Sequence, residues 1–136
     1  MVEATEGEAP VFQDLTVFRT AMAMVRHAGH QQAISAQNIA NSDTPGYRAL
    51  TMKSFAETIK PAQSGARATR VGHLHGNQSD ATYQVGERRK AQDPNGNTVA
   101  LELELLQAVN ADRQSNRALS IYRSNLTILR ASLGRG

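Results

Sequence analysis

The side chains best suited to metal chemistry are the four histidines, which fall into two pairs. His27 and His30 stand at i and i+3, so on a helix they would share one face, where two imidazoles bind a metal ion only weakly. No acidic residue or further histidine adjoins them, and we interpret them as an exposed polar pair. His73 and His75 form a His-x-His in a glycine-rich stretch. Nothing in this spacing requires the four rings to converge, and we predict no metal site.

Patterns typical of enzymes are missing from the sequence. Glu102 and Glu104 stand at i and i+2, which directs them to different faces of a helix and argues against a paired-carboxylate site. The chain has no cysteine, which excludes a disulfide framework and cysteine-ligated zinc. No glycine-rich phosphate loop precedes a Lys-Thr or Lys-Ser pair. We therefore predict that the protein is not an enzyme and has no catalytic residue and no cofactor.

Length and charge narrow the class of protein further. The 136 residues allow one domain at most. The formal net charge of +3 comes from scattered side chains without interleaved aromatic residues, so we expect no nucleic-acid partner. No stretch approaches the ~18–20 apolar residues of a membrane-spanning helix. Residues 1–14 lack the basic start and apolar block of a cleavable signal peptide. We expect no membrane insertion, and any export to proceed without such a signal.

Two stretches with apolar residues at alternating intervals of three and four predict long helices that each pack on another helix. The first is predicted over residues 14–43, with Asp14 as its N-cap and a disordered acidic segment at residues 1–13. The second is predicted over residues 98–133, capped by Thr98 or Asn97. The expected packing positions are Leu15, Phe18, Met22, Val25, Ile39, Leu101, Leu105, Leu119, Tyr122, Leu126, Leu129 and Leu133. Further apolar residues beside the second row make it wider than one partner helix can cover.

The stretch between these helices is polar and broken by glycine and proline. Residues 44–60 are predicted to form a turn motif followed by an extended segment or a short helix. Residues 61–97 are predicted to be a flexible insert, with a strand at residues 82–85 that could form a hairpin with residues 69–71. The predicted fold is mainly α: two long amphipathic helices in an antiparallel, coiled-coil-like pair, with a polar loop or small β-hairpin inserted between them.

The residues that close the first helix have strong turn chemistry. Pro45 and Gly46 suit the two central positions of a type II turn, because proline presets φ and glycine accepts a positive φ. Thr44 precedes proline and is pushed away from helical geometry, so the helix must end by about Asp43. Asn41 could cap that end in a left-handed conformation.

The complete run from Asn38 to Tyr47, Asn-Ile-Ala-Asn-Ser-Asp-Thr-Pro-Gly-Tyr, is more specific than its parts. It resembles the motif of the bacterial flagellar axial proteins, the rod and hook family. The short chain, and the linker and helix that follow Pro94, look most like the proximal rod members of that family. The resemblance covers residues 15–53 and 94–133, and the middle of the chain carries none of it.

This resemblance implies a structural subunit that assembles helically into the hollow drive shaft of the flagellum and so serves motility. The terminal helices would pack together around a central channel. The implied partners are other rod subunits, the adaptor that joins the rod to the membrane ring, and the flagellar type III export apparatus. The implied location is the basal body, where the rod spans the periplasm. The motif residues that would shape the helix exit and dock on a neighbouring subunit are Asn38, Ile39, Asn41, Thr44, Pro45, Gly46 and Tyr47.

A cytosolic helical coiled-coil adaptor or scaffold is the alternative interpretation. It would use the same two helices, but it has no need of the Thr-Pro-Gly-Tyr turn between them. Substitution of Gly46 by valine therefore discriminates between the two, because it should abolish rod assembly and leave an adaptor largely intact.

Overall fold

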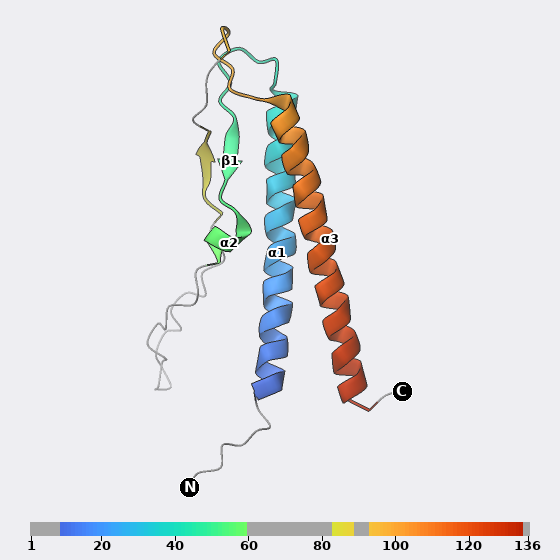
Figure 1. The fold of residues 1–136 in the computed structure, drawn as a ribbon. Helices are drawn as coiled ribbons and strands as arrows, with labels where there is room; N and C mark the ends of the chain where they lie inside the picture. The colour runs from blue at the N-terminus through green and yellow to red at the C-terminus, as the bar shows by residue number, and fades with distance from the viewer. Residues whose placement is uncertain (1–8, 60–82, 89–92, 135–136) are drawn as a thin grey trace, which may run out of the picture.

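Two long antiparallel helices form the body of the molecule (Figure 1). The computed structural model describes residues 9–59, 83–88 and 93–134. Helix α1 spans Ala9–Ala40 and helix α3 spans Leu101–Ser132, and each contains 32 residues, which corresponds to about 48 Å at ~1.5 Å per residue. They lie side by side with both termini at the same end of the pair. The predicted fold class, mainly α with two packed helices, is confirmed.

Small and polar side chains, rather than leucines, line the contact between α1 and α3. Three buried residues of α1 and four of α3 in this contact recur every seven positions along their helix. A seven-residue repeat keeps one face of a helix turned toward its partner, and small side chains allow the two backbones to approach closely. The inner row consists of Ala21, Ala28 and Ser35 on α1, and of Glu104, Ala111, Ala118 and Asn125 on α3.

This row corrects the packing positions predicted from the large apolar residues. Phe18 and Tyr122 do meet, with ring centroids 5.0 Å apart in an edge-to-face arrangement. Val25, Ile39, Leu126 and Leu129 are half-buried. The remaining predicted positions lie on the outside of the chain, because the small residues beside them occupy the contact. These exposed side chains are Leu15, Met22, Leu101, Leu105, Leu119 and Leu133.

The helix ends also differ from the prediction. Helix α1 already includes Ala9, so it begins before Asp14, which is not its N-cap, and it extends into the segment expected to be disordered. Helix α3 has Ala100 as its N-cap residue, with no side-chain capping bond. Asn41 does not adopt the left-handed conformation, because among the described residues only glycines have positive φ.

A short β-ribbon lies along α1 (Figure 1). Strand β1 (Leu50–Met52) pairs antiparallel with strand β2 (Val85–Glu87), and Leu50 lies opposite Glu87. Helix α2 (Phe55–Thr58) follows β1, so residues 49–59 form both the extended segment and the short helix that the sequence left open. The strand predicted at residues 82–85 thus lies slightly later and pairs with β1. Its predicted partner, residues 69–71, lies outside the described residues.

Within the part of the chain that the structure describes, no helix has the length and apolar character needed to cross a membrane.

Candidate functional site

The predicted type II turn is present at the end of α1. The backbone N–H of Tyr47 donates to the carbonyl of Thr44 at 3.2 Å, and Gly46 has φ +72°. A positive φ at the third position of the turn is what this turn type requires, and glycine adopts it without a steric penalty. Thr44, Pro45 and Gly46 are exposed and form the crest of the turn.

A second turn, residues 93–98, docks against the first. The N–H of Gly46 donates to the carbonyl of Asn95 at 3.0 Å, and the N–H of Thr98 donates to the carbonyl of Tyr47 at 3.1 Å. Gly96 has φ +80°, and a Cβ placed there would lie 3.4 Å from the Cα of Gly46. The two glycines therefore allow two backbone segments that are distant in the sequence to lie in close contact.

Asn97 ties the second turn to the end of α1. Its Nδ2 lies 3.0, 2.7 and 2.9 Å from the carbonyl oxygens of Asn41, Ser42 and Thr44, and its Oδ1 accepts from the N–H of Val99 at 2.8 Å. The side chain is almost fully buried. The sequence suggested a capping residue for the second helix, but Asn97 instead binds three carbonyls of the segment that directly follows the first helix.

Asn38 connects α1 to β1 and to α3. Its Nδ2 donates to the carbonyl of Leu50 at 2.8 Å and to Oε2 of Glu104 at 3.0 Å. Its Oδ1 accepts from the N–H of Leu50 at 2.9 Å and from the hydroxyl of Tyr47 at 3.3 Å. Asn38 is fully buried, and all these partners belong to the same chain. Asn38 therefore shapes the motif from inside the subunit.

A buried ion pair extends this network across α3. Arg88, directly after β2, donates from Nη1 to Oε1 of Glu104, and from Nη2 to Oε1 of Gln107 at 3.1 Å. Gln31 of α1 donates to the same Gln107 oxygen at 3.1 Å. Glu104 is fully buried while Glu102 is exposed, so the two carboxylates do point to different faces. Sequence reasoning missed the Arg88–Glu104 pair, since nothing in the sequence places these residues together.

The environment of Tyr47 reflects its position beside this network. Burial raises the pKa of the Tyr47 hydroxyl above its usual value, and the nearby Glu104 carboxylate raises it further. The hydroxyl donates to Oδ1 of Asn38, and the ring is half-buried within the subunit. Of the predicted motif residues, Ile39 and Asn41 are half-buried as well. Among the predicted motif residues, only those of the crest, Thr44, Pro45 and Gly46, are exposed and so accessible to a neighbouring molecule.

His27 corrects the expectation of an exposed histidine pair. Its side chain is almost fully buried, and its Nε2 lies 2.9 Å from the carbonyl oxygen of Lys53, directly after β1. A carbonyl only accepts, so Nε2 is the donor of this hydrogen bond. The ring packs edge-on against Phe55 and Tyr83, and the exposed ring of His30 also contacts Tyr83. His73 and His75 lie outside the described residues.

Large apolar side chains remain exposed along both long helices. Four of them cluster on the first turns of α3, and others follow α1 and the rest of α3. Exposed apolar surface of this kind is typical of sites that contact another molecule. The exposed large apolar residues of these helices are Leu15, Val17, Met22, Leu101, Leu105, Leu106, Val109, Leu119, Ile121 and Ile128.

Comparisons with known proteins identify the segment that carries the motif. Residues 26–48 match the family described as flagella basal body rod protein. This segment covers the second half of α1 and the type II turn. A comparison with curated proteins gave no match to the chain. The helix exit built around Asn38 and the Thr44–Tyr47 turn is therefore similar to that of the family described as flagella basal body rod protein.

Proposed function

We propose that the chain is a proximal rod subunit similar to FlgB, which assembles helically with its neighbours through α1 and α3. The observation that carries the proposal is the family match over residues 26–48, together with the built turn that the same residues form. The exposed apolar residues of the two helices support it. A two-helix pair that leaves such surface uncovered gains stability when other subunits cover it.

In this proposal the motif has an inner part and an outer part. Asn38 and Asn97 are buried and hold the turn in one shape. The exposed crest, Thr44, Pro45 and Gly46, then docks on an adjacent subunit. Because the shape is fixed before contact, little conformational entropy is lost on docking. Tyr47 contributes mainly from inside, since its hydroxyl already has a partner.

The proposed partners follow from the proposed role. They are other rod subunits, the adaptor that links the rod to the membrane ring, and the flagellar export apparatus. The proposed location is the rod of the basal body, across the periplasm. Non-closing contacts of one subunit on the next would build a continuous shaft from subunits that each have a small core.

A complementation experiment tests this function. A strain lacking the chain should lose motility and the rod, and a tagged wild-type copy should restore both and be recovered in isolated basal bodies. Gly46→Val should fail to restore them, because a β-branched residue strongly disfavours φ +72°. Gly86→Val is the matched control, because Gly86 lies in the exposed strand β2 with open space at its Cβ position.

Two results would contradict the proposal. One is full motility in the strain without the chain. The other is the recovery of intact basal bodies that do not contain the tagged wild-type copy although motility is restored.

A further inference from the structure

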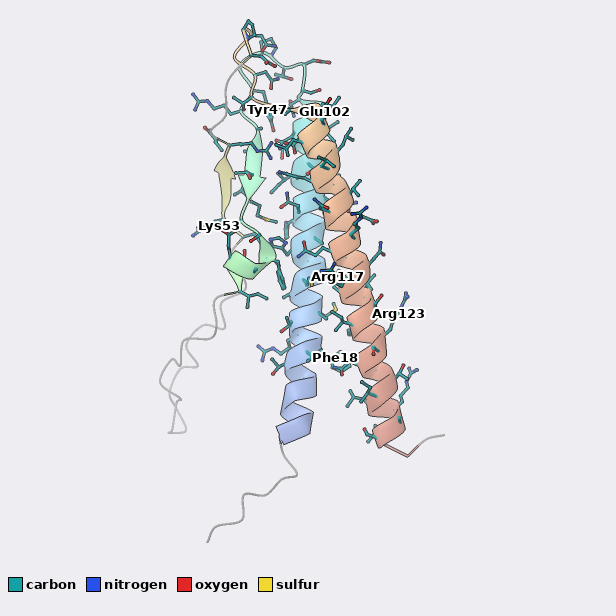
Figure 2. The ribbon with its side chains drawn as sticks, in the orientation of Figure 1. Phe18, Tyr47, Lys53, Glu102, Arg117 and Arg123 are labelled. Carbon is teal, nitrogen blue, oxygen red and sulfur yellow. The ribbon has the colours of Figure 1, made fainter. Side chains whose placement is uncertain are left out.

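Two exposed patches of opposite charge lie at opposite ends of the helix pair. The first, which we call the acidic patch, occupies the first turns of α3 and combines one carboxylate with four large apolar side chains. Its apolar members are between 48% and 61% exposed. This patch lies at the end of the molecule where the turn motif is found (Figure 2). It consists of Leu101, Glu102, Leu105, Leu106 and Val109.

The second patch, which we call the basic patch, lies on the first half of α1. Leu15 and Met22 are 53% and 41% exposed, and Arg26 is exposed one turn after Met22. The i, i+4 and i, i+7 spacings place the three side chains on one side of the helix. The residues that flank the β-ribbon pack on a different side of α1, where Lys53 and Tyr83 contact His27 and Tyr83 also contacts Ala23. Since α1 and α3 are antiparallel, the basic patch lies toward the end that carries the chain termini.

We propose, building on the function proposed above, that the acidic patch of one copy binds the basic patch of the next copy. Both patches are apolar enough to favour burial. Contact between two acidic patches would bring two Glu102 carboxylates together, and contact between two basic patches would bring two Arg26 side chains together. Like charges at a contact disfavour it, whereas Glu102 against Arg26 is complementary. Charge therefore selects the head-to-tail contact.

The positions of the two patches along the helix axis give the displacement between successive copies along that axis. Asn38 and Glu104 are hydrogen bonded, so the acidic patch lies level with Asn38 on α1. From Met22 to Asn38 the helix rises about 24 Å at ~1.5 Å per residue. Successive copies are thus displaced by about 24 Å along the helix axis. A contact between two different surfaces of the same molecule forms a ring only when successive copies are related by rotation alone. The axial displacement prevents that closure, so the contact repeats into an open helical array.

Cysteine cross-linking of the full chain tests the contact directly, because the chain has no cysteine of its own. Leu105→Cys and Met22→Cys chains are purified separately, mixed and oxidised. We expect a disulfide-linked pair containing one of each chain. A mixture of Leu105→Cys with Ser124→Cys is the control, since Ser124 is an exposed residue of α3 outside both patches, and it should give at least about fivefold less product.

Charge reversal tests the chemistry of the same contact. Glu102→Arg and Arg26→Glu should each lower the yield of the Leu105–Met22 cross-link by about fivefold, and the two reversals combined, one on each chain of the mixture, should restore it. Equal yields for all charge variants, or no Leu105–Met22 product above the Ser124→Cys control, would overturn the proposal. Its failure is distinct from failure of the proposed function. If only the contact is wrong, both charge variants still enter basal bodies and support motility, whereas if the function is wrong, motility does not depend on the chain at all.

Discussion

The side-chain amide of Asn38 pairs with the backbone of Leu50 as a neighbouring strand would. Its Nδ2 donates to the carbonyl of Leu50 at 2.8 Å, and its Oδ1 accepts from the N–H of Leu50 at 2.9 Å. An unpaired backbone group at a buried sheet edge is costly. A helix side chain thus satisfies both backbone groups of Leu50 and fixes the position of β1 along α1.

The first prediction concerns this amide. Asn38→Asp replaces the donor by a carboxylate oxygen that faces the carbonyl of Leu50 and the carboxylate of Glu104. We expect a loss of about 3 kcal/mol or more in the free energy of unfolding, measured with urea, because a buried charge is left beside acceptors. Asn116→Asp is the control: Asn116 is exposed and bonds only along its own helix to Asp112, and should cost less than about 1 kcal/mol. Similar losses for both variants would show that the Asn38 amide contributes no more to the free energy of unfolding than an exposed amide does.

The second prediction concerns the ion pair that joins β2 to α3. Arg88→Met leaves the fully buried Glu104 carboxylate without its cation, and we expect a cost of about 3–5 kcal/mol in the free energy of unfolding. Arg48→Met removes one partner of the exposed Arg48–Glu87 pair, whose side chains are 61% and 58% exposed. That control should cost less than about 1 kcal/mol.

A double variant tests whether the loss of stability comes from leaving one charge of the Arg88–Glu104 pair without its partner. Arg88→Met combined with Glu104→Gln removes both charges and should cost clearly less than the sum of the two single changes. Additive losses would mean that the two side chains are not coupled.

The third prediction concerns the contact between the two turns. Gly96→Ala places a Cβ 3.4 Å from the Cα of Gly46 and forces alanine to φ +80°. A left-handed conformation costs a non-glycine residue about 1–2 kcal/mol, so thermal unfolding followed by circular dichroism should show a lower Tm. Gly29→Ala has open space in the middle of α1 and should raise stability by about 0.5–1 kcal/mol. The explanation fails if Gly96→Ala is as stable as the wild type.

The fourth prediction concerns alkaline pH. The folded-state pKa of Tyr47 is raised above 10.0, first by burial and then by Glu104. A raised pKa means that folding favours the protonated phenol, so this contribution is complete below pH 10.0 and is lost as pH rises through the folded pKa. Stability should therefore fall more steeply above pH 10.0 in the wild type than in Tyr47→Phe. Identical pH profiles for the two proteins would rule out a role for this hydroxyl.

Local chemistry made part of the structure predictable. The Pro45-Gly46 turn depends on the φ preferences of two adjacent residues, and it is present as predicted. The two long helices follow from apolar periodicity over many residues, and both are present. Periodicity does not say which of two adjacent rows faces inward, however. The leucines were assigned to the contact between helices, but Ala111 and Ala118 occupy it.

The buried polar network could not be derived from the sequence. Asn38 and Glu104 are 66 residues apart, and their contact exists only because α1 and α3 are aligned at one height. Arg88 reaches Glu104 because β2 pairs with β1, a pairing that the sequence did not predict. His27 was expected to be exposed for the same reason, since the ribbon that covers it was not foreseen.

The bonds made by Asn38 and Asn97 gather three distant stretches of the chain at one end of the helix pair. The opposite end, which carries the termini, has no such clasp of loops and strands among the described residues (Figure 1). Hydrogen bonds between distant stretches are therefore concentrated at one end of the helix pair. If the subunits assemble as proposed, we expect the less restrained tips of α1 and α3 to be the part that adjusts to different neighbours.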